Sequence, residues 1–263
     1  MTFRAQNTLK APVKPDEFAL QALNPPIRLR LNEAQIIDDE KQRFKDVVTA
    51  AIANGLYSRF LAIHMDMSHR MHTMNGDAVG TQRFLPWHRD YLLKLETAMR
   101  AFDPAFIIPY WDWTTDRQVP GWLANFLPAG VKDPAGHAIQ ITRDPGNSSD
   151  AEARALPTVA DVAALATVGT YTEFTLRLEG AQPFGLHNQV HDWVNGTMSD
   201  VMVSPADPLF WLHHAQIDRL WLQWAMAHPG QVPVVKPVHE TLDPWPEKIG
   251  DVLDVAQLGY NYG

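Results

Sequence analysis

The chain reads Phe184-Gly-Leu-His187-Asn-Gln-Val-His191 from residue 184 and Asp207-Pro-Leu-Phe-Trp-Leu-His-His214-Ala-Gln-Ile-Asp218 from residue 207. His187 and His191 are four residues apart, so on a helix both imidazoles project from one face, one turn apart. His214 begins a second run with helical apolar spacing, which continues to Trp224. Three imidazoles from two helices can hold one metal ion with part of its coordination sphere open, and copper, zinc and iron all accept such ligands. The two runs therefore predict either a metal site or three neighbouring core histidines.

A second motif lies in the first half of the chain and reads Phe84-Leu-Pro-Trp-His88-Arg-Asp-Tyr-Leu-Leu-Lys-Leu-Glu96. Taken alone, His88 is equally well explained as a core histidine at the start of a helix. Two histidine-bearing motifs in this order favour a metal site instead.

Both motifs resemble the copper-binding motifs, CuA and CuB, of the tyrosinases, catechol oxidases and hemocyanins. The resemblance is strongest to short bacterial tyrosinases. It extends through Tyr110-Trp-Asp-Trp113 and the closing Tyr260-Asn-Tyr262, and so covers nearly the whole chain. It implies two copper ions, each held by three histidines, with dioxygen as co-substrate and small phenols as substrates. His187, His191 and His214 would bind CuB. For Asp112 and Asp218 we expect structural roles or ordinary surface or capping positions, not metal binding.

The CuA ligands depart from the family pattern. In resembling enzymes the middle histidine usually lies nine residues before the one in Trp-His-Arg, and that position here is Val79. By resemblance His64 is the first ligand, so His69 or His72 must be the middle one. If the helix continued past His64, His69 would point about 140° away from it and His72 only about 80°. We predict that His64, His72 and His88 bind CuA. One alternative is that His69 is the middle ligand, and the other is that the CuA site is incomplete.

Two further residues bear on the reaction. In resembling bacterial tyrosinases an Asn and a Glu at the positions of Asn188 and Glu179 hold a water that can deprotonate a phenol. A phenol has a pKa of about 10, so such a base matters more for monophenols than for catechols. The resemblance therefore implies ortho-hydroxylation of monophenols and oxidation of o-diphenols to o-quinones. The alternative for both residues is an ordinary capping or solvent-facing role.

Other activities fit the same histidines. A catechol or o-aminophenol oxidase without monophenolase activity is the nearest alternative, and an oxygen carrier would use the same ligands with restricted access. A zinc hydrolase of the His-Glu-x-x-His type is disfavoured because Asn188 replaces the general-base Glu.

One residue near the predicted site differs in charge from its counterpart in resembling bacterial tyrosinases. Asp192 follows His191, where several resembling bacterial tyrosinases carry a basic residue. If Asp192 lines the entrance, it would disfavour phenols that bear a carboxylate and favour neutral or cationic ones. Val201 is a candidate wall of the same entrance or an ordinary core residue.

Composition sets outer limits on the function. Hydrophobic residues make up 46% of the chain and charged residues 20%, as in a globular protein. A net charge of −8 disfavours nucleic acid and anionic membranes as partners. The absence of cysteine excludes disulfides and the Cys–His thioether of resembling fungal and plant enzymes. No signal-peptide core is visible, so we expect a cytoplasmic chain; its oligomeric state and any copper-delivery partner stay open.

We expect a mainly α fold, in which a four-helix bundle core holds the dinuclear copper site, with long irregular loops and few short strands. A helix is predicted with Asp38 or Asp39 as its N-cap, running through about Ala53 and stopping at Asn54-Gly55. Further helices are predicted from Leu56 through His64 and over 85–102, 161–166, 171–178 and the run after His214. Residues 1–26, 66–80 and 114–157 are predicted as irregular. Residues 1–263 are expected to form one tyrosinase-type copper-binding core domain without the β-rich C-terminal lid of longer resembling chains.

Overall fold

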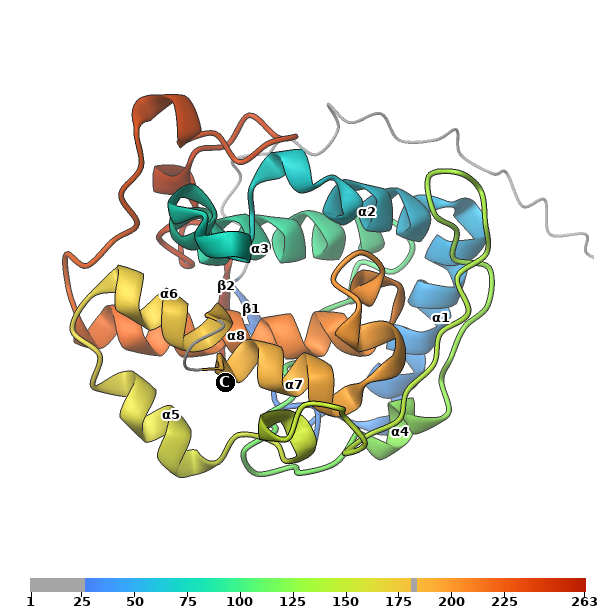
Figure 1. Cartoon of the computed structure of the whole chain (residues 1–263). Helices are drawn as coiled ribbons and strands as arrows, with labels where there is room; N and C mark the ends of the chain where they lie inside the picture. The colour runs from blue at the N-terminus through green and yellow to red at the C-terminus, as the bar shows by residue number, and fades with distance from the viewer. Residues whose placement is uncertain (1–26, 181–183) are drawn as a thin grey trace, which may run out of the picture.

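The structure, a computed structural model, describes residues 27–180 and 184–263; the expectation for residues 1–26 lies outside this range. The described chain is mainly helical, as predicted, with long loops and two short strands (Figure 1). Its α-helices are α1 (Asp38–Asn54), α2 (Leu56–Met65), α3 (Ala78–Met99), α4 (Gly121–Ala124), α5 (Val159–Ala166), α6 (Tyr171–Glu179), α7 (Leu186–Val194) and α8 (Leu209–Ala227). Its 3₁₀ turns are η2 (Met67–His69), η3 (Met74–Gly76), η4 (Glu152–Arg154), η5 (Gly196–Ser199), η6 (Ser204–Ala206), η7 (Pro237–His239) and η8 (Ile249–Val252). No described helix has the length and apolar character needed to cross a membrane.

Helices α2, α3, α7 and α8 surround the centre of the molecule. Figure 1 shows α2 and α3 on one side of this centre and α7 and α8 on the other. Helix α3 packs against α6 and α8, and α6 packs against α7. The predicted loop over residues 114–157 contains only α4, η4 and one isolated strand pairing, between Lys132 and Ala138. Long, mostly irregular loops therefore accompany the helical core, as expected.

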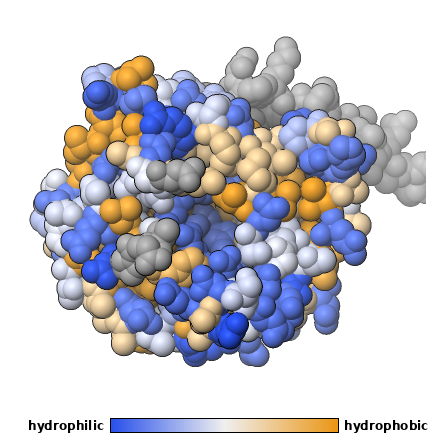
Figure 2. Space-filling view, viewed as in Figure 1, coloured by the Kyte–Doolittle hydropathy of each residue, from blue (hydrophilic) through white to orange (hydrophobic). Residues whose placement is uncertain are grey.

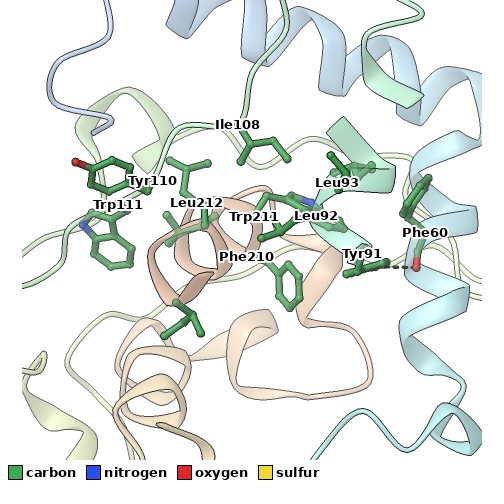
Figure 3. Close-up of a cluster of buried hydrophobic side chains, with 14 of the residues drawn as sticks. Phe60, Tyr91, Leu92, Leu93, Ile108, Tyr110, Trp111, Phe210, Trp211 and Leu212 are labelled. Atoms are coloured by element: carbon green, nitrogen blue, oxygen red, sulfur yellow. Dashed lines mark hydrogen bonds between the residues drawn. The ribbon is translucent and has the colours of Figure 1, made fainter. Parts of the chain in front are cut away.

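Buried aromatic side chains join α2, α3 and α8 (Figure 3). The ring centroids of Phe60 and Tyr91 are 5.7 Å apart, and those of Tyr91 and Trp211 are 4.8 Å apart. The Tyr91 hydroxyl donates a hydrogen bond of 2.8 Å to the Phe60 carbonyl oxygen. Because this bond links α3 to α2 one turn from His64 and His88, it holds the two helices in register beside both histidines.

The junction between α1 and α2 follows the predicted stop at Asn54-Gly55. Gly55 has a φ of 80°, in the left-handed region that favours glycine after a helix. The predicted aspartate cap was wrong: Ile37 occupies the cap position, and its backbone N–H donates to Glu40 Oε2 at 3.0 Å. Asp38 and Asp39 lie in the first turn instead, where carboxylates interact favourably with the helix dipole.

Helix α3 begins at Ala78, seven residues before the predicted start, and so corrects the assignment of the segment up to residue 80 as loop. The Asp77 side chain caps its first turn by accepting a hydrogen bond from the backbone N–H of Val79 at 3.0 Å. Pro86 lies inside the helix and lacks the N–H that would bond to the carbonyl of Gln82. That carbonyl accepts a hydrogen bond from the Tyr171 hydroxyl instead, at 3.1 Å, so α6 compensates for the proline.

Strand β1 (Arg28–Arg30) pairs in parallel with β2 (Tyr260–Tyr262), which brings the end of the described chain to Asp218 on α8. Asp218 is buried and accepts hydrogen bonds from the hydroxyls of Tyr260 and Tyr262 at 2.7 and 2.6 Å and from Arg89 Nε at 2.5 Å. Its carboxylate is thus fully engaged in a structural network. This agrees with the expectation that Asp218 is not a metal ligand.

Candidate metal centre

The structure brings His187, His191 and His214 together, and we call these residues the second histidine group. His187 and His191 lie on the inner face of α7, and His214 lies in the second turn of α8. All three are buried. His214 Nε2 lies 3.2 Å from His187 Nε2 and 3.3 Å from His191 Nε2.

The hydrogen bonds of the Nδ1 atoms determine whether the Nε2 atoms of His187 and His191 carry a proton or a lone pair. His187 Nδ1 lies 2.9 Å from Asn188 Oδ1, and the Asn188 amide donates to the Glu179 carbonyl at 2.8 Å. Because the amide nitrogen is used there, Asn188 presents its oxygen to His187, and His187 Nδ1 is the donor. His191 Nδ1 likewise donates to the Met198 carbonyl at 2.7 Å. The Nε2 atoms of both rings therefore carry lone pairs that point at the same place.

A metal ion placed among the three Nε2 atoms would take up the lone pairs of His187 and His191. Metal–imidazole bonds of about 2.0–2.1 Å place neighbouring ligand nitrogens at a separation close to the observed 3.2 and 3.3 Å. The second histidine group therefore fits a three-coordinate metal with an open position.

His64, His72 and His88 form the first histidine group, whose ligand atoms all lie within 4.8 Å of one another. His72 Nδ1 donates to Glu179 Oε1 at 2.5 Å, and His88 Nδ1 donates to the Phe84 carbonyl at 2.8 Å. Among the buried atoms of the described residues, the Nε2 atoms of His72 and His88 and both ring nitrogens of His64 lack a protein hydrogen-bond partner. Buried polar atoms without a partner cost free energy unless something else binds them, and a metal ion meets that need.

His69, the alternative middle ligand, lies outside this group. Its ring stacks on Trp87 with centroids 6.2 Å apart, and its Nε2 lies 3.8 Å from Asp66 Oδ2. The turn η2 ends at His69, and Arg70 follows with a positive φ of 50°, which redirects the chain before His72. The backbone thus turns His72 toward His64 and His88. That the six histidines are the copper ligands stays a prediction, and the geometry favours it.

One histidine beside the second group was not singled out from the sequence. His213 is buried, and it comes within 4.8 Å of the ligand atoms of His187, His191 and His214. The Trp113 indole N–H donates to His213 Nδ1 at 3.2 Å, which leaves the proton of the neutral ring on Nε2 and no lone pair for a metal. The adjacent pair His213-His214 was the available signal. The contact with Trp113 distinguishes His213, and the Nε2 contacts with His187 and His191 distinguish His214.

Burial keeps these rings uncharged. It lowers the pKa of His64, His88, His187 and His214 well below the usual value and lowers the pKa of His191 to about 4, because a low-dielectric site disfavours the imidazolium. Neutral imidazole is the form that binds copper. At neutral pH the protein therefore presents its histidines ready for a metal.

Glu179 and Asn188, the two predicted catalytic residues, lie between the groups. The Glu179 carboxylate is buried and accepts a second hydrogen bond, from the backbone N–H of Thr73, at 2.8 Å. Burial raises the pKa of Glu179, while the bond to His72 opposes this shift. Each residue thus holds one histidine ring of one group, Glu179 that of His72 and Asn188 that of His187.

A cavity of about 540 Å³ opens onto both groups, and Figure 2 shows the hollow in this face of the molecule. Glu179, Asn188, Asp192 and Val201 all line it. The remaining walls are mostly apolar and include Met74, Leu176, Phe184, Met198 and Phe210. Apolar walls with few polar groups suit a planar ring.

Comparisons with known proteins agree with this geometry. The common central domain of tyrosinase matches residues 54–147 and 131–227. Tyrosinases from Streptomyces lincolnensis and Streptomyces glaucescens are 34% and 33% identical, each over 86% of this chain and 96% of the relative. Grixazone synthase from Streptomyces griseus is 30% identical over 90% of this chain and 99% of that protein.

Solved structures show the same fold. A functional unit of octopus hemocyanin has a TM-score of 0.68 at 22% identity and covers 89% of this chain and 68% of that one. A polyphenol oxidase from Thermothelomyces thermophila has a TM-score of 0.65 at 21% identity and covers 90% of this chain and 89% of that one. With two histidine groups that fit a dinuclear copper site and a family match over most of its length, the chain belongs to the tyrosinase family of copper oxidases.

Proposed function

We propose that this copper oxidase hydroxylates monophenols at the ortho position and oxidises o-diphenols to o-quinones with dioxygen. The observation that carries the proposal is the cavity, which gives a ring direct access to histidines of both groups and to Asn188 and Glu179. Two copper ions held by the two histidine groups would activate dioxygen and pass electrons to it from the phenolic substrate. The residues of the chain then orient the ring and handle its proton.

The apolar walls bind and orient the ring. Phe210 stacks on His214 with ring centroids 4.0 Å apart and an interplanar angle of 25°, which fixes the plane of that imidazole. Met198 and Val201 line the cavity beside it. A ring bound between these side chains is proposed to direct its hydroxyl at the histidines and its para substituent at the opening.

Asn188 and Glu179 are proposed to hold the water that accepts the phenol proton. Both line the cavity, and each keeps an oxygen lone pair beyond its hydrogen bonds within the protein. A positioned acceptor near these oxygens would favour the phenolate, the form that a monophenol must reach before reaction.

The test compares a matched pair, 4-ethylphenol and 4-ethylcatechol, with the copper-loaded protein, and quinone products are trapped and identified by mass spectrometry. Turnover of both compounds, with oxygen inserted ortho to the hydroxyl of 4-ethylphenol, is expected. Turnover of the catechol alone would establish the second candidate, an o-diphenol or o-aminophenol oxidase. That candidate stands because grixazone synthase, at 30% identity, is nearly as similar to this chain as the tyrosinases are.

A further inference from the structure

The cavity in front of the histidines has an unbalanced set of charges. Apart from histidines, the charged residues that line it are Glu179 and Asp192, and no lysine or arginine does so within the described chain. Glu179 already accepts hydrogen bonds from His72 and Thr73, and its remaining lone pair is the one proposed to hold the water. Asp192 is therefore the one lining carboxylate that is free to meet a ligand.

Asp192 has no hydrogen-bond or ion-pair partner within residues 27–180 and 184–263. It lies on α7 directly after His191 and is partly exposed to the cavity. Burial, and then the negative charge of Asp150, raise its pKa, so its surroundings lack positive charge. An unpaired carboxylate at the wall of an apolar cavity attracts a cation.

Cations on the segments that line the cavity are already paired. These segments, residues 64–76, 171–180, 184–194 and 196–214, contain two basic residues besides histidine, Arg70 and Arg177. Arg70 binds both oxygens of Asp77, at 2.9 and 2.5 Å. Arg177 lies 3.6 Å from Glu173 on the exposed side of α6. Neither arginine lines the cavity, and each has a carboxylate partner of its own.

We infer that Asp192 forms a subsite for an alkylammonium group, so that the preferred substrates are phenols or catechols whose para side chain ends in a primary amine. The inference rests on the proposed function for the orientation of the ring. The apolar walls would bind the ring and a short methylene chain, and Asp192 would bind the ammonium at the opening. Substrates whose side chain carries a carboxylate would meet unbalanced negative charge and no basic partner.

The experiment uses three catechols with the same ring and similar chains: dopamine, 4-ethylcatechol and 3-(3,4-dihydroxyphenyl)propionate. Catechols are chosen because their oxidation does not depend on monophenolase activity, so failure of that activity leaves this test intact. For the copper-loaded protein, kcat/KM should be highest for dopamine, the cation, lower for the neutral 4-ethylcatechol, and lowest for the anionic 3-(3,4-dihydroxyphenyl)propionate. Asp192→Asn should lower the ratio of dopamine to 4-ethylcatechol by about two- to fivefold, as expected for one partly exposed ion pair.

Asp200→Asn is the matched control. Asp200 is an exposed aspartate close to Asp192 in the chain, does not line the cavity, and accepts a hydrogen bond from the backbone N–H of Met202 at 2.9 Å, which asparagine can also accept. A loss of cation preference in Asp192→Asn that exceeds the loss in Asp200→Asn supports the subsite. Equal losses in both variants, or an initial preference for the anion, overturn it. Calorimetric binding of phenethylamine, which lacks a phenol, should weaken in parallel in Asp192→Asn alone.

Discussion

The two histidine groups hold their rings by contacts of very different range. In the second group, the acceptors for His187 and His191 lie one and seven residues away in sequence, at Asn188 and Met198. In the first group, the acceptor for His88 lies four residues away, but the acceptor for His72 is Glu179, 107 residues away. Helix α7 and the turn after it can therefore orient the rings of His187 and His191 by local contacts, and α8 adds His214. The first group is complete only when α6 has docked beside residues 72 and 73.

The first prediction contrasts His72 with His69 and should give the largest effect. His72→Ala should remove one of two bound copper ions, because it deletes a converging nitrogen from the first histidine group. His69→Ala should keep both ions, because that ring stacks on Trp87 outside the group. Metal analysis by mass spectrometry on each purified variant gives the answer. Retention of both ions in His72→Ala together with loss in His69→Ala would reverse the assignment.

The second prediction concerns acid. Burial lowers the pKa of His64 and His88 in the first group and of His187, His191 and His214 in the second, to about 4 for His191. In the unfolded chain a histidine titrates near ~6.5. As pH falls below about 6.5 the unfolded state takes up protons that the folded state cannot bind. The copper-free protein should therefore lose stability as pH falls from 6.5 to 4, by up to about 1.4 kcal/mol per pH unit for each such imidazole. Urea unfolding at pH 7.5, 6.5 and 5.5 measures this loss.

Bound copper should resist the same acidification, since the metal occupies the nitrogens that protons would take. The second histidine group, with the adjacent His213 also shifted down by burial, should account for more of the acid sensitivity than the first. Stability of the copper-free protein that stays flat or rises between pH 7.5 and 5.5 would contradict the assignment of neutral buried rings.

The third prediction tests the close packing of Gly80 on α3 against the backbone of His72, a residue of the first histidine group. A Cβ on Gly80 would lie 1.7 Å from the His72 carbonyl oxygen, a backbone atom that cannot move without shifting the loop. Gly80→Ala should therefore destabilise the protein by about 3 kcal/mol and weaken copper binding at the first group before the second. Gly121→Ala is the control, because nothing lies within 4 Å of its Cβ and its φ is not positive. Thermal unfolding and copper titration that failed to separate the two variants would argue against this packing.

The fourth prediction compares Glu179, which orients His72 in the first group, with Asn188, which orients His187 in the second. Glu179 accepts hydrogen bonds from two donors, His72 Nδ1 and the Thr73 N–H, and a glutamine has one oxygen for them. Glu179→Gln should weaken copper binding at the first group by about 10- to 100-fold, as is usual when the partner of a ligand histidine is lost. Asn188→Ala should have a smaller effect on copper at the second group, because it removes one hydrogen bond to His187.

Both variants should also reduce turnover of 4-ethylphenol more than turnover of 4-ethylcatechol, if the two residues hold the proton-accepting water. Copper is measured first, and rates are compared per bound copper pair. Unchanged ratios in both fully loaded variants would limit Glu179 and Asn188 to positioning histidines.

Sequence reasoning succeeded where structure is local. The i, i+4 spacing of His187 and His191, the helical run after His214 and the stop at Gly55 all follow from backbone periodicity and glycine conformation. The early start of α3 was missed because residues 66–80 were predicted as irregular, whereas Asp77 caps the helix at Ala78. The helix then continues through Pro86, whose missing hydrogen bond is replaced by a donor from α6, Tyr171. A proline inside a helix cannot be judged without knowing which distant donor replaces its hydrogen bond.

The residues alone predicted a mainly helical protein with two metal-binding histidine motifs, because side-chain spacing and ligand chemistry are properties of short segments. The choice of copper came from the resemblance of those motifs to a known family. The folded chain was needed to bring His72 rather than His69 beside His64 and His88, and to separate His214 from His213 through the indole of Trp113. It was also needed to show that no cation balances Asp192 in the cavity of the described chain. These outcomes depend on contacts between segments up to about a hundred residues apart, and periodicity along the chain does not encode which distant groups will meet.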